Sequence, residues 1–405
     1  MNNYGQKICL AMIVKNEAHV IRRCLDSVRP IIDHWIVVDT GSTDGTQDLV
    51  RAVMADLPGQ LVERPWVDFA FNRTEALRLA RPYAHYSLII DADDELIIPE
   101  QFAMPHLRHA AYAFTIIDTE NNYTRRQLID NSRTWEYVGV IHEFLHCTGQ
   151  ADQSVMPLSI RRGHDGARRR DNETASRDIA LLEKALLSEK HPFLRARYTF
   201  YLADYYHSNE REREALDLYL KRADLGHGDE EIYKSLISAA SIRETLGAPP
   251  DRVLELYDRA IRILPERAEA RHRASRYCRH KKDFRTGFHY AEAGLSLQLP
   301  AEGIDLEPWV YVFGLRQEFS IHAYYTNQHR ACLFTCLEIL AQSGVPDEVR
   351  TQTGDLAKAA LGKMIEPVWG CQQAAYSAEF VLDWLRRDCA RHAALSAQFQ
   401  VAPTR

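Results

Sequence analysis

Four acidic side chains follow directly after one apolar run of the sequence. The run occupies residues 88–90 (LII), and residues 91–95 are DADDE, so four carboxylates fall within five positions. Because such charges repel one another, a cation among them would stabilise the segment, and oxygen ligands of this kind suit hard divalent ions such as Mg²⁺ or Mn²⁺. Acidic turns after strands are common, so the motif alone is weak evidence for a metal site. It is stronger evidence if the preceding apolar run is a strand of a parallel sheet.

Two further apolar runs end in polar residues. Residues 8–14 precede the sequence KNE, and residues 35–38 precede Asp39 and the sequence TGSTDGT. Asp39 could accept a hydrogen bond from a nucleobase or a ribose, and its alternative role is to cap the turn and helix that follow. The sequence contains neither GxGxxG nor GxxxxGKS/T, so a dinucleotide-binding Rossmann site or a P-loop is not indicated.

A third motif suggests a different chemistry. Residues 142–146 (HEFLH) match the HExxH pattern of zinc metalloproteases, in which two histidines on one helix face bind zinc. The preceding residues 135–141 are β-branched and aromatic and include Gly139, so we do not expect a helix there. His164 could be a third ligand by spacing alone. A zinc protease is therefore a remote alternative.

The elements that must position these residues alternate in the first 160 or so residues. The predicted strands are 7–14, 35–38, 61–63 and 86–90, and the predicted helices are 18–28, 43–55 and 72–80. Ser42 or Thr43 is the expected N-cap of the second helix. This order predicts an open, mostly parallel α/β sheet with right-handed crossovers, and 113–117 and 135–141 are predicted as additional strands. Because ligands bind beyond the carboxyl ends of such strands, we expect Asp39 and residues 91–95 to meet at one edge.

The second part of the chain is predicted to be all-α. Three segments resemble one another, at residues 214–225, 252–264 and 286–297. Their tyrosines, Tyr219, Tyr257 and Tyr290, are spaced 38 and then 33 residues apart. An aromatic residue, a small residue and then a proline at a period near 34 are typical of tetratricopeptide repeats, and a generic helical bundle is the alternative. We expect one domain at 1–165 and a tetratricopeptide-like helical domain at 166–405.

Composition excludes several classes of protein. The 405 residues include 50 Lys and Arg against 56 Asp and Glu, which gives a net charge of −6. We therefore do not expect a nucleic-acid partner, because contacts with phosphates favour a net positive charge. No apolar stretch is long enough for a transmembrane segment, and no signal peptide is apparent. The eight cysteines form no CxxC pair, so we expect a reducing, cytoplasmic location.

Five arginines lie in the predicted connection between the two parts. Residues 161–170 are RRGHDGARRR. We favour a solvated connector, and neutralisation of a bound phosphate is the alternative.

The order of motifs resembles that of the family 2 glycosyltransferases, which have the GT-A fold. Residues 11–17 (AMIVKNE), 36–46 (IVVDTGSTDGT) and 91–93 (DAD) are the residues on which this resemblance rests. Residues 69–77 and 135–143 resemble a bacterial branch with C-terminal tetratricopeptide repeats, which includes transferases similar to bacteriocin peptide S-glycosyltransferases. The similarity extends over about residues 7–245.

The resemblance implies a binding site for a nucleotide-sugar donor. Asp39 would hold the nucleobase, in a pocket lined by the backbone near Met12 and Val14, with Glu17 beside it. Asp91 would contact the ribose.

The resemblance also implies a metal site and a catalytic base. Asp93 would bind Mn²⁺ or Mg²⁺ on the diphosphate, and His142 resembles a histidine that completes such sites. Arg73 would reach the diphosphate or the sugar. An inverting enzyme needs a base near the acceptor nucleophile. The candidates are Glu143, Asp94 and Glu95, of which we favour Glu143.

The expected function is that of a metal-dependent inverting glycosyltransferase with a UDP-hexose as donor. The helical repeats would bind a peptide or protein acceptor or support a homo-oligomer. A glycan, a lipid-linked molecule or a nucleic acid is an alternative acceptor. The alternative from another class is a tetratricopeptide scaffold whose transferase domain is inactive.

Overall fold

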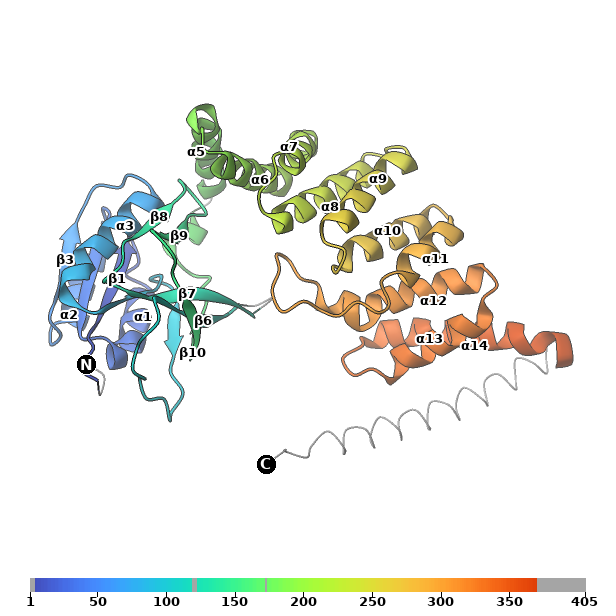
Figure 1. The fold of residues 1–405 in the computed structure, drawn as a ribbon, viewed down its shortest axis with the longest axis horizontal. Helices are drawn as coiled ribbons and strands as arrows, with labels where there is room; N and C mark the ends of the chain where they lie inside the picture. The colour runs from blue at the N-terminus through green and yellow to red at the C-terminus, as the bar shows by residue number, and fades with distance from the viewer. Residues whose placement is uncertain (1–3, 119–121, 172, 370–405) are drawn as a thin grey trace. The chain divides into compact units, whose positions relative to one another are not determined.

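The structure is a computed structural model that describes residues 4–118, 122–171 and 173–369. It divides into two compact units, Met1–Tyr206 and His207–Arg405 (Figure 1). No helix in the described ranges is both long enough and apolar enough to cross a membrane.

The N-terminal unit is built around an eight-stranded sheet with the order β3-β2-β1-β4-β7-β6-β10-β5. Its strands are β1 (Ile8–Val14), β2 (His34–Asp39), β3 (Gly59–Glu63), β4 (Tyr86–Ile89), β5 (Glu95–Ile97), β6 (Ala111–Ile117), β7 (Asn122–Asp130) and β10 (Gln153–Arg161). Strands β1 to β4 pair in parallel, as predicted. Strand β7 is antiparallel to both β4 and β6, while β10 is parallel to β6 and antiparallel to β5. The prediction of an α/β domain with a mostly parallel sheet is confirmed for its first half.

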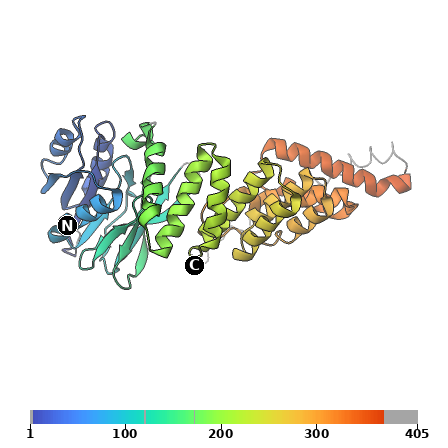
Figure 2. The same ribbon diagram turned by 90° about the horizontal axis from the view of Figure 1, so that it is seen from above.

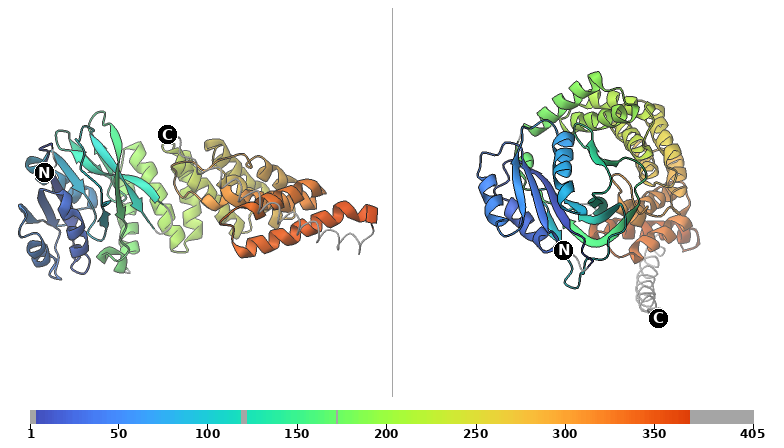
Figure 3. Two further views of the ribbon diagram at one scale, coloured as in Figure 1. Left: turned by 90° about the horizontal axis from the view of Figure 1, so that it is seen from below. Right: turned by 60° about the vertical axis from the view of Figure 1, so that its left-hand side comes forward.

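Helices cover both faces of the parallel strands (Figure 3). Alternate residues of β1, from Ile8 to Val14, pack with helices α1 (Ile21–Val28) and α2 (Thr46–Val53). Cys9 and Ala11 face the other way, toward helix α3 (Phe69–Ala80). Because β1 is buried on both faces, its sequence is apolar throughout. Short 3-10 turns, η1 (Arg29–Ile31) and η2 (Arg81–Tyr83), follow α1 and α3.

A small hairpin and three further helices complete this unit. The hairpin consists of β8 (Trp135–Val138) and β9 (Phe144–Cys147), and β8 packs against α3. The helices are α4 (Ala167–Arg170), α5 (Thr174–Ser188) and α6 (Pro192–Ser208). Because the compact unit extends to Tyr206, it includes α4, α5 and most of α6. The domain boundary after residue 165 stays a prediction.

Over residues 207–369, the part that the structure describes, the C-terminal unit is all-α, as predicted (Figure 2). Its elements are α7 (Glu212–Asp224), α8 (Asp229–Thr245), α9 (Pro250–Ile263), α10 (Glu269–His280), α11 (Phe284–Glu292), the π-helical turn η3 (Val310–Gly314), α12 (Leu315–Tyr325), α13 (His329–Ala341) and α14 (Asp347–Trp369). Successive helices pack on one another as tetratricopeptide-like hairpins. The predicted repeat segments fall on α7, α9 and α11, where Tyr219 and Tyr257 are buried.

The start of α2 differs from the prediction. The helix begins at Thr46 with Gly45 as its N-cap, so the assignment of Ser42 or Thr43 as N-cap is wrong. Ser42 Oγ instead accepts a hydrogen bond from the Asn16 N–H at 2.8 Å, and the Thr43 N–H donates to Asn16 Oδ1 at 2.8 Å. These polar groups tie the turn after β2 to the turn after β1.

Candidate active site

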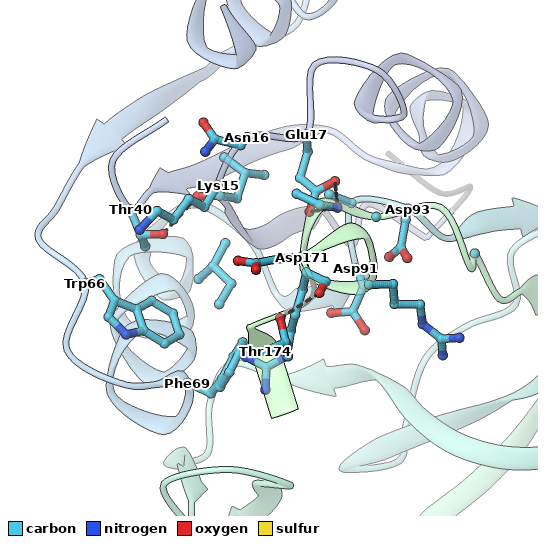
Figure 4. Close-up of a pocket in the computed structure, with 18 of the residues that line it drawn as sticks. Lys15, Asn16, Glu17, Thr40, Trp66, Phe69, Asp91, Asp93, Asp171 and Thr174 are labelled. Atoms are coloured by element: carbon cyan, nitrogen blue, oxygen red, sulfur yellow. Dashed lines mark hydrogen bonds between the residues drawn. The ribbon is translucent and has the colours of Figure 1, made fainter. Parts of the chain in front are cut away.

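A cavity of about 670 Å³ lies at the carboxyl ends of β1 and β4 (Figure 4). The lining residues from the predicted motifs lie at positions 13–17, 40, 73 and 91–94. Trp66 and Phe69 line it as well, and residues 162–181 supply further side chains. This is the edge at which ligands of parallel α/β sheets bind.

Asp39 lies just behind the cavity, and Thr40 lines it. The Asp39 side chain is buried, and its Oδ1 accepts hydrogen bonds from the N–H groups of Gly41 at 3.0 Å and Ser42 at 2.9 Å. Gly41 has a φ of 102°, a conformation that favours glycine. Asp39 Oδ2 is buried and has no hydrogen-bond partner. One oxygen therefore shapes the turn, and the other is available to a donor.

The end of β1 supplies three predicted residues. Val14 lines the cavity, while Met12 is buried in the core beneath it. Both Glu17 oxygens lie 3.2 Å from the Ala167 N–H. Burial raises the pKa of Glu17 to about 7; the Ala167 hydrogen bond opposes this shift and the negative charge of Asp93 adds to it.

Asp91 is paired with two arginines. Arg73 Nη2 lies 2.6 Å from Asp91 Oδ1, and Arg125 Nη1 lies 3.6 Å from Oδ2. Burial opposes ionisation of Asp91, but the two guanidinium groups hold its pKa well below the usual range. Asp91 is therefore a carboxylate at neutral pH.

Asp93 and Asp94 have different surroundings. Asp94 is almost fully buried, and its carboxylate accepts a hydrogen bond from the Gly163 N–H at 3.0 Å and lies 3.3 Å from Arg125 Nη2. Burial and the charge of Asp91 raise the pKa of Asp94 to about 6. The same two causes raise the pKa of Asp93, whose side chain lines the cavity (Figure 4).

Arg73 connects Glu143 to the cavity. Arg73 Nε lies 2.7 Å from Glu143 Oε1, and the guanidinium lies 5.5 Å from the centre of the Tyr137 ring. Burial raises the pKa of Glu143, while the charge of Arg73 lowers it. Arg73 lines the cavity and Glu143 lies behind it, so the predicted base is placed beside the site through Arg73.

The structure does not place His142 in the cavity. Its ring stacks on Tyr201, with centroids 3.7 Å apart and an interplanar angle of 8°. Burial lowers the pKa of His142 to about 4, and the charge of Arg197 adds to this shift, so the ring is neutral at pH 7. Across the described ranges, no three His, Cys, Asp or Glu side chains converge on a preformed metal site.

The HExxH motif lies in a loop and a strand. Residues 144–147 form β9, and His146 is exposed. The two histidines therefore share no helix face, and His164 contacts Asp118 at 2.9 Å. The zinc-protease alternative is wrong because the His142 ring is stacked on Tyr201 while the His146 side chain is exposed on β9, so the two rings do not converge on one ion.

The arginine-rich segment is largely exposed, as expected of a solvated connector, and it also contributes side chains to the cavity. Arg162, Arg168 and Arg169 line the cavity. Arg168 contacts the buried Asp178 at 2.6 Å, and its guanidinium lies 4.6 Å from the centre of the Phe69 ring.

Sequence reasoning also missed Trp66, Phe69 and the side of α5 that lines the cavity. Thr174 and Leu181 belong to that side. Phe69 begins the segment 69–77 that carries part of the family resemblance, but the resemblance assigned it no role in the site. The arginine-rich residues 161–170 were the signal that could have drawn attention to the start of α5.

Comparisons with known proteins agree with this geometry. Residues 9–138 match the family described as Glycosyl transferase family 2. A TPR repeat-containing protein of Synechococcus elongatus is 36% identical over 120 residues, which cover 28% of each chain. An uncharacterized glycosyltransferase of Rickettsia felis is 37% identical over 91 residues, covering 22% of this chain and 30% of that protein. The SPbeta prophage-derived glycosyltransferase SunS of Bacillus subtilis is 25% identical over 232 residues, or 53% of each chain.

The chain therefore spans about half the length, or less, of these relatives. The family match covers β1 to β8, which include the strand ends with Asp39, Asp91 and Asp93. Residues 9–138 of this chain are a family 2 glycosyltransferase domain, and tetratricopeptide-like helices follow it.

Proposed function

We propose that this chain is an inverting glycosyltransferase that transfers a hexose from a UDP-sugar to a peptide or protein acceptor. The observation that supports this proposal is the shared cavity of Asp91, Asp93 and the ends of β1 and β2 within a family 2 domain. Six charged groups of each sign along the cavity suit a ligand that combines a diphosphate with hydroxyl groups.

The nucleotide would bind at the ends of β1 and β2. Asp39 Oδ2, buried and without a hydrogen-bond partner, would accept an N–H of the nucleobase. The backbone from Met12 to Val14 and the side chain of Glu17 would lie beside the base. Asp91, whose side chain is 30% exposed, would accept a ribose hydroxyl.

Asp93 suits a divalent cation such as Mn²⁺ or Mg²⁺. Its pKa is raised by burial and by the charge of Asp91, so a cation at its carboxylate would relieve an unfavourable accumulation of negative charge. The bound ion would neutralise charge on the departing diphosphate. The role of His142 as a second metal ligand stays a prediction. To reach the ion, its ring would have to leave the stack on Tyr201.

We propose Glu143 as the base that takes the proton from the acceptor nucleophile. Its pKa is raised by burial, and Arg73, which lines the cavity, contacts its carboxylate at 2.7 Å. Asp94 is the second candidate: it lines the cavity, but Gly163 engages its Oδ1 and Arg125 its Oδ2. By contrast, Arg73 contacts Glu143 at Oε1.

The acceptor would bind to the helical unit. Stacked helical hairpins present extended surfaces that suit a peptide, and the same surfaces could support a homo-oligomer. A glycan or lipid-linked acceptor is the alternative, and the net charge of −6 disfavours a nucleic acid. A cytoplasmic location stays a prediction.

The test is a thermal-shift panel with UDP, GDP, CMP and dTDP, each with Mn²⁺, Mg²⁺ or EDTA. A ligand that binds only the folded state raises the apparent stability. We expect a shift with UDP and Mn²⁺ that EDTA and Asp93→Asn abolish, while Asp48→Asn, on exposed α2 surface, leaves it unchanged. No shift with any nucleotide would favour the inactive scaffold.

A further inference from the structure

The loop between β8 and β9 has an unusual backbone. It comprises residues 139–143, and two of them have positive φ angles, Gly139 at 111° and His142 at 50°. A left-handed conformation is uncommon for a residue other than glycine and stores strain that the surrounding structure must compensate. The loop therefore depends on contacts from outside itself.

Helix α6 supplies those contacts. The Val140 N–H donates to Tyr198 Oη at 3.0 Å. Arg197 donates to the His142 carbonyl from both Nε and Nη2, at 3.0 and 2.8 Å. The His142 ring stacks on Tyr201, over which the Arg197 guanidinium also lies, 4.9 Å from the ring centre.

These contacts determine where the next residue lies. Glu143 follows His142 directly, and its side chain, only 12% exposed, reaches Arg73 at 2.7 Å. Arg73 in turn contacts Asp91 at 2.6 Å and lines the cavity. A continuous series of polar contacts thus joins α6 to the carboxylate at the end of β4.

We infer that Arg197 and Tyr198 are positioning residues for Glu143, an inference that rests on the proposed glycosyl transfer. They fix the β8–β9 loop so that Glu143 meets Arg73 at the cavity. Neither residue lines the cavity itself, so neither would touch the substrate. Both lie beyond the family match at residues 9–138, so a helix outside that match would orient the proposed base.

The test uses the full chain with UDP-glucose and Mn²⁺, and follows the release of UDP by hydrolysis. Arg197→Lys keeps the charge but loses the planar pair of donors, and Tyr198→Phe leaves the Val140 N–H without its acceptor. Matched controls on the same helix are Arg195→Lys, where the arginine bonds the Glu189 carbonyl, and Tyr206→Phe, where the hydroxyl bonds Glu183.

We expect each test variant to lower kcat about tenfold to hundredfold while KM and the Kd for UDP stay within about twofold, because misplacing a reacting group slows chemistry without removing nucleotide contacts. Arg197→Met should lower kcat more than Arg197→Lys does. In a Glu143→Gln background, Arg197→Lys should have no further effect on kcat, since residues that act through one another are not additive.

Two results separate the inference from the proposed function. If the wild-type chain hydrolyses UDP-glucose and the test variants match the controls in kcat, or if their effects add fully to that of Glu143→Gln, the positioning role is overturned. If the wild-type chain neither binds UDP nor releases it from UDP-glucose, the proposed function is overturned instead. The positioning role then falls as well, because it rests on that function.

Discussion

Arg73 Nη2 lies 2.6 Å from Asp91 Oδ1, and this contact joins helix α3 to the end of strand β4. The same guanidinium contacts Glu143, so one cation compensates two carboxylates. Its side chain is only 18% exposed, and water therefore screens these charges weakly. The arrangement keeps Asp91 ionised inside the cavity, where a hydroxyl group could bind it.

We predict that Arg73→Met lowers the free energy of unfolding by about 3 kcal/mol. The substitution removes the cation that contacts Glu143, and it leaves this buried carboxylate uncompensated. Urea unfolding at pH 7 measures the change. The matched control is Arg51→Met, whose guanidinium is 52% exposed and pairs with Asp48 and Glu63. We expect the control to change the free energy by less than about 1 kcal/mol. Equal effects of the two variants would show that the Arg73 pair is no stronger than a surface pair.

A second prediction concerns the unpartnered oxygen of Asp39. Asp39→Asn can keep the acceptor for Gly41 and Ser42 but replaces Oδ2 with an amide that donates. We expect the melting temperature to change little and the affinity for UDP to fall about tenfold to hundredfold, because two donors would then face each other. Isothermal titration calorimetry with UDP measures the affinity, and Asp48→Asn is the control. Unchanged binding would mean that Asp39 only shapes the turn.

The sequence predicts the parallel half of the sheet better than the rest. Strands β1, β2 and β4 are buried on both faces, so each leaves an uninterrupted apolar run. Strand β7 begins with exposed polar residues, and β5 has only three residues, so neither shows a periodic pattern. These strands form because their partners lie beside them, which no local pattern records.

The residues of the candidate site likewise divide into those that the sequence predicts and those that it does not. Asp91 and Asp93 follow a predicted strand, and the rule for strand ends places them correctly at the cavity. The contact of Arg73 with Glu143 joins segments far apart in the sequence, and it depends on how β8 packs against α3. The HExxH pattern misleads for the opposite reason, since a short local match says nothing about the strand in which it lies.

A third prediction tests the close approach of the chain to Asp93. A Cβ on Gly166 would lie 2.7 Å from Asp93 Oδ2, closer than real contacts allow. Gly166→Ala should therefore displace the carboxylate and reduce the Mn²⁺-dependent thermal shift with UDP by at least half. Gly362→Ala is the control, since its Cβ would meet open space and alanine favours a helix by about 1 kcal/mol. A full Mn²⁺-dependent shift in Gly166→Ala would remove Asp93 from the metal site.

The fourth prediction concerns stability against pH in the helical unit. His272 on α10 is buried with its ring edge-on to Trp309, and burial, with the charges of Arg276, Arg273 and Arg279, lowers its pKa to about 3. The unfolded chain binds a proton near pH 6.5 and the folded chain does not, so stability is lost as the pH falls from about 6.5 toward 3.

At pH 5 this loss amounts to about 2 kcal/mol relative to pH 8. Urea unfolding of the wild type and His272→Leu at both pH values measures it, since leucine cannot bind a proton. We expect the difference between pH 8 and pH 5 to be about 2 kcal/mol smaller in His272→Leu than in the wild type. The control is His280→Leu on the same helix, where the side chain is exposed and the wild-type difference should persist. If His272→Leu keeps the full wild-type difference, another group is responsible for the loss of stability in acid.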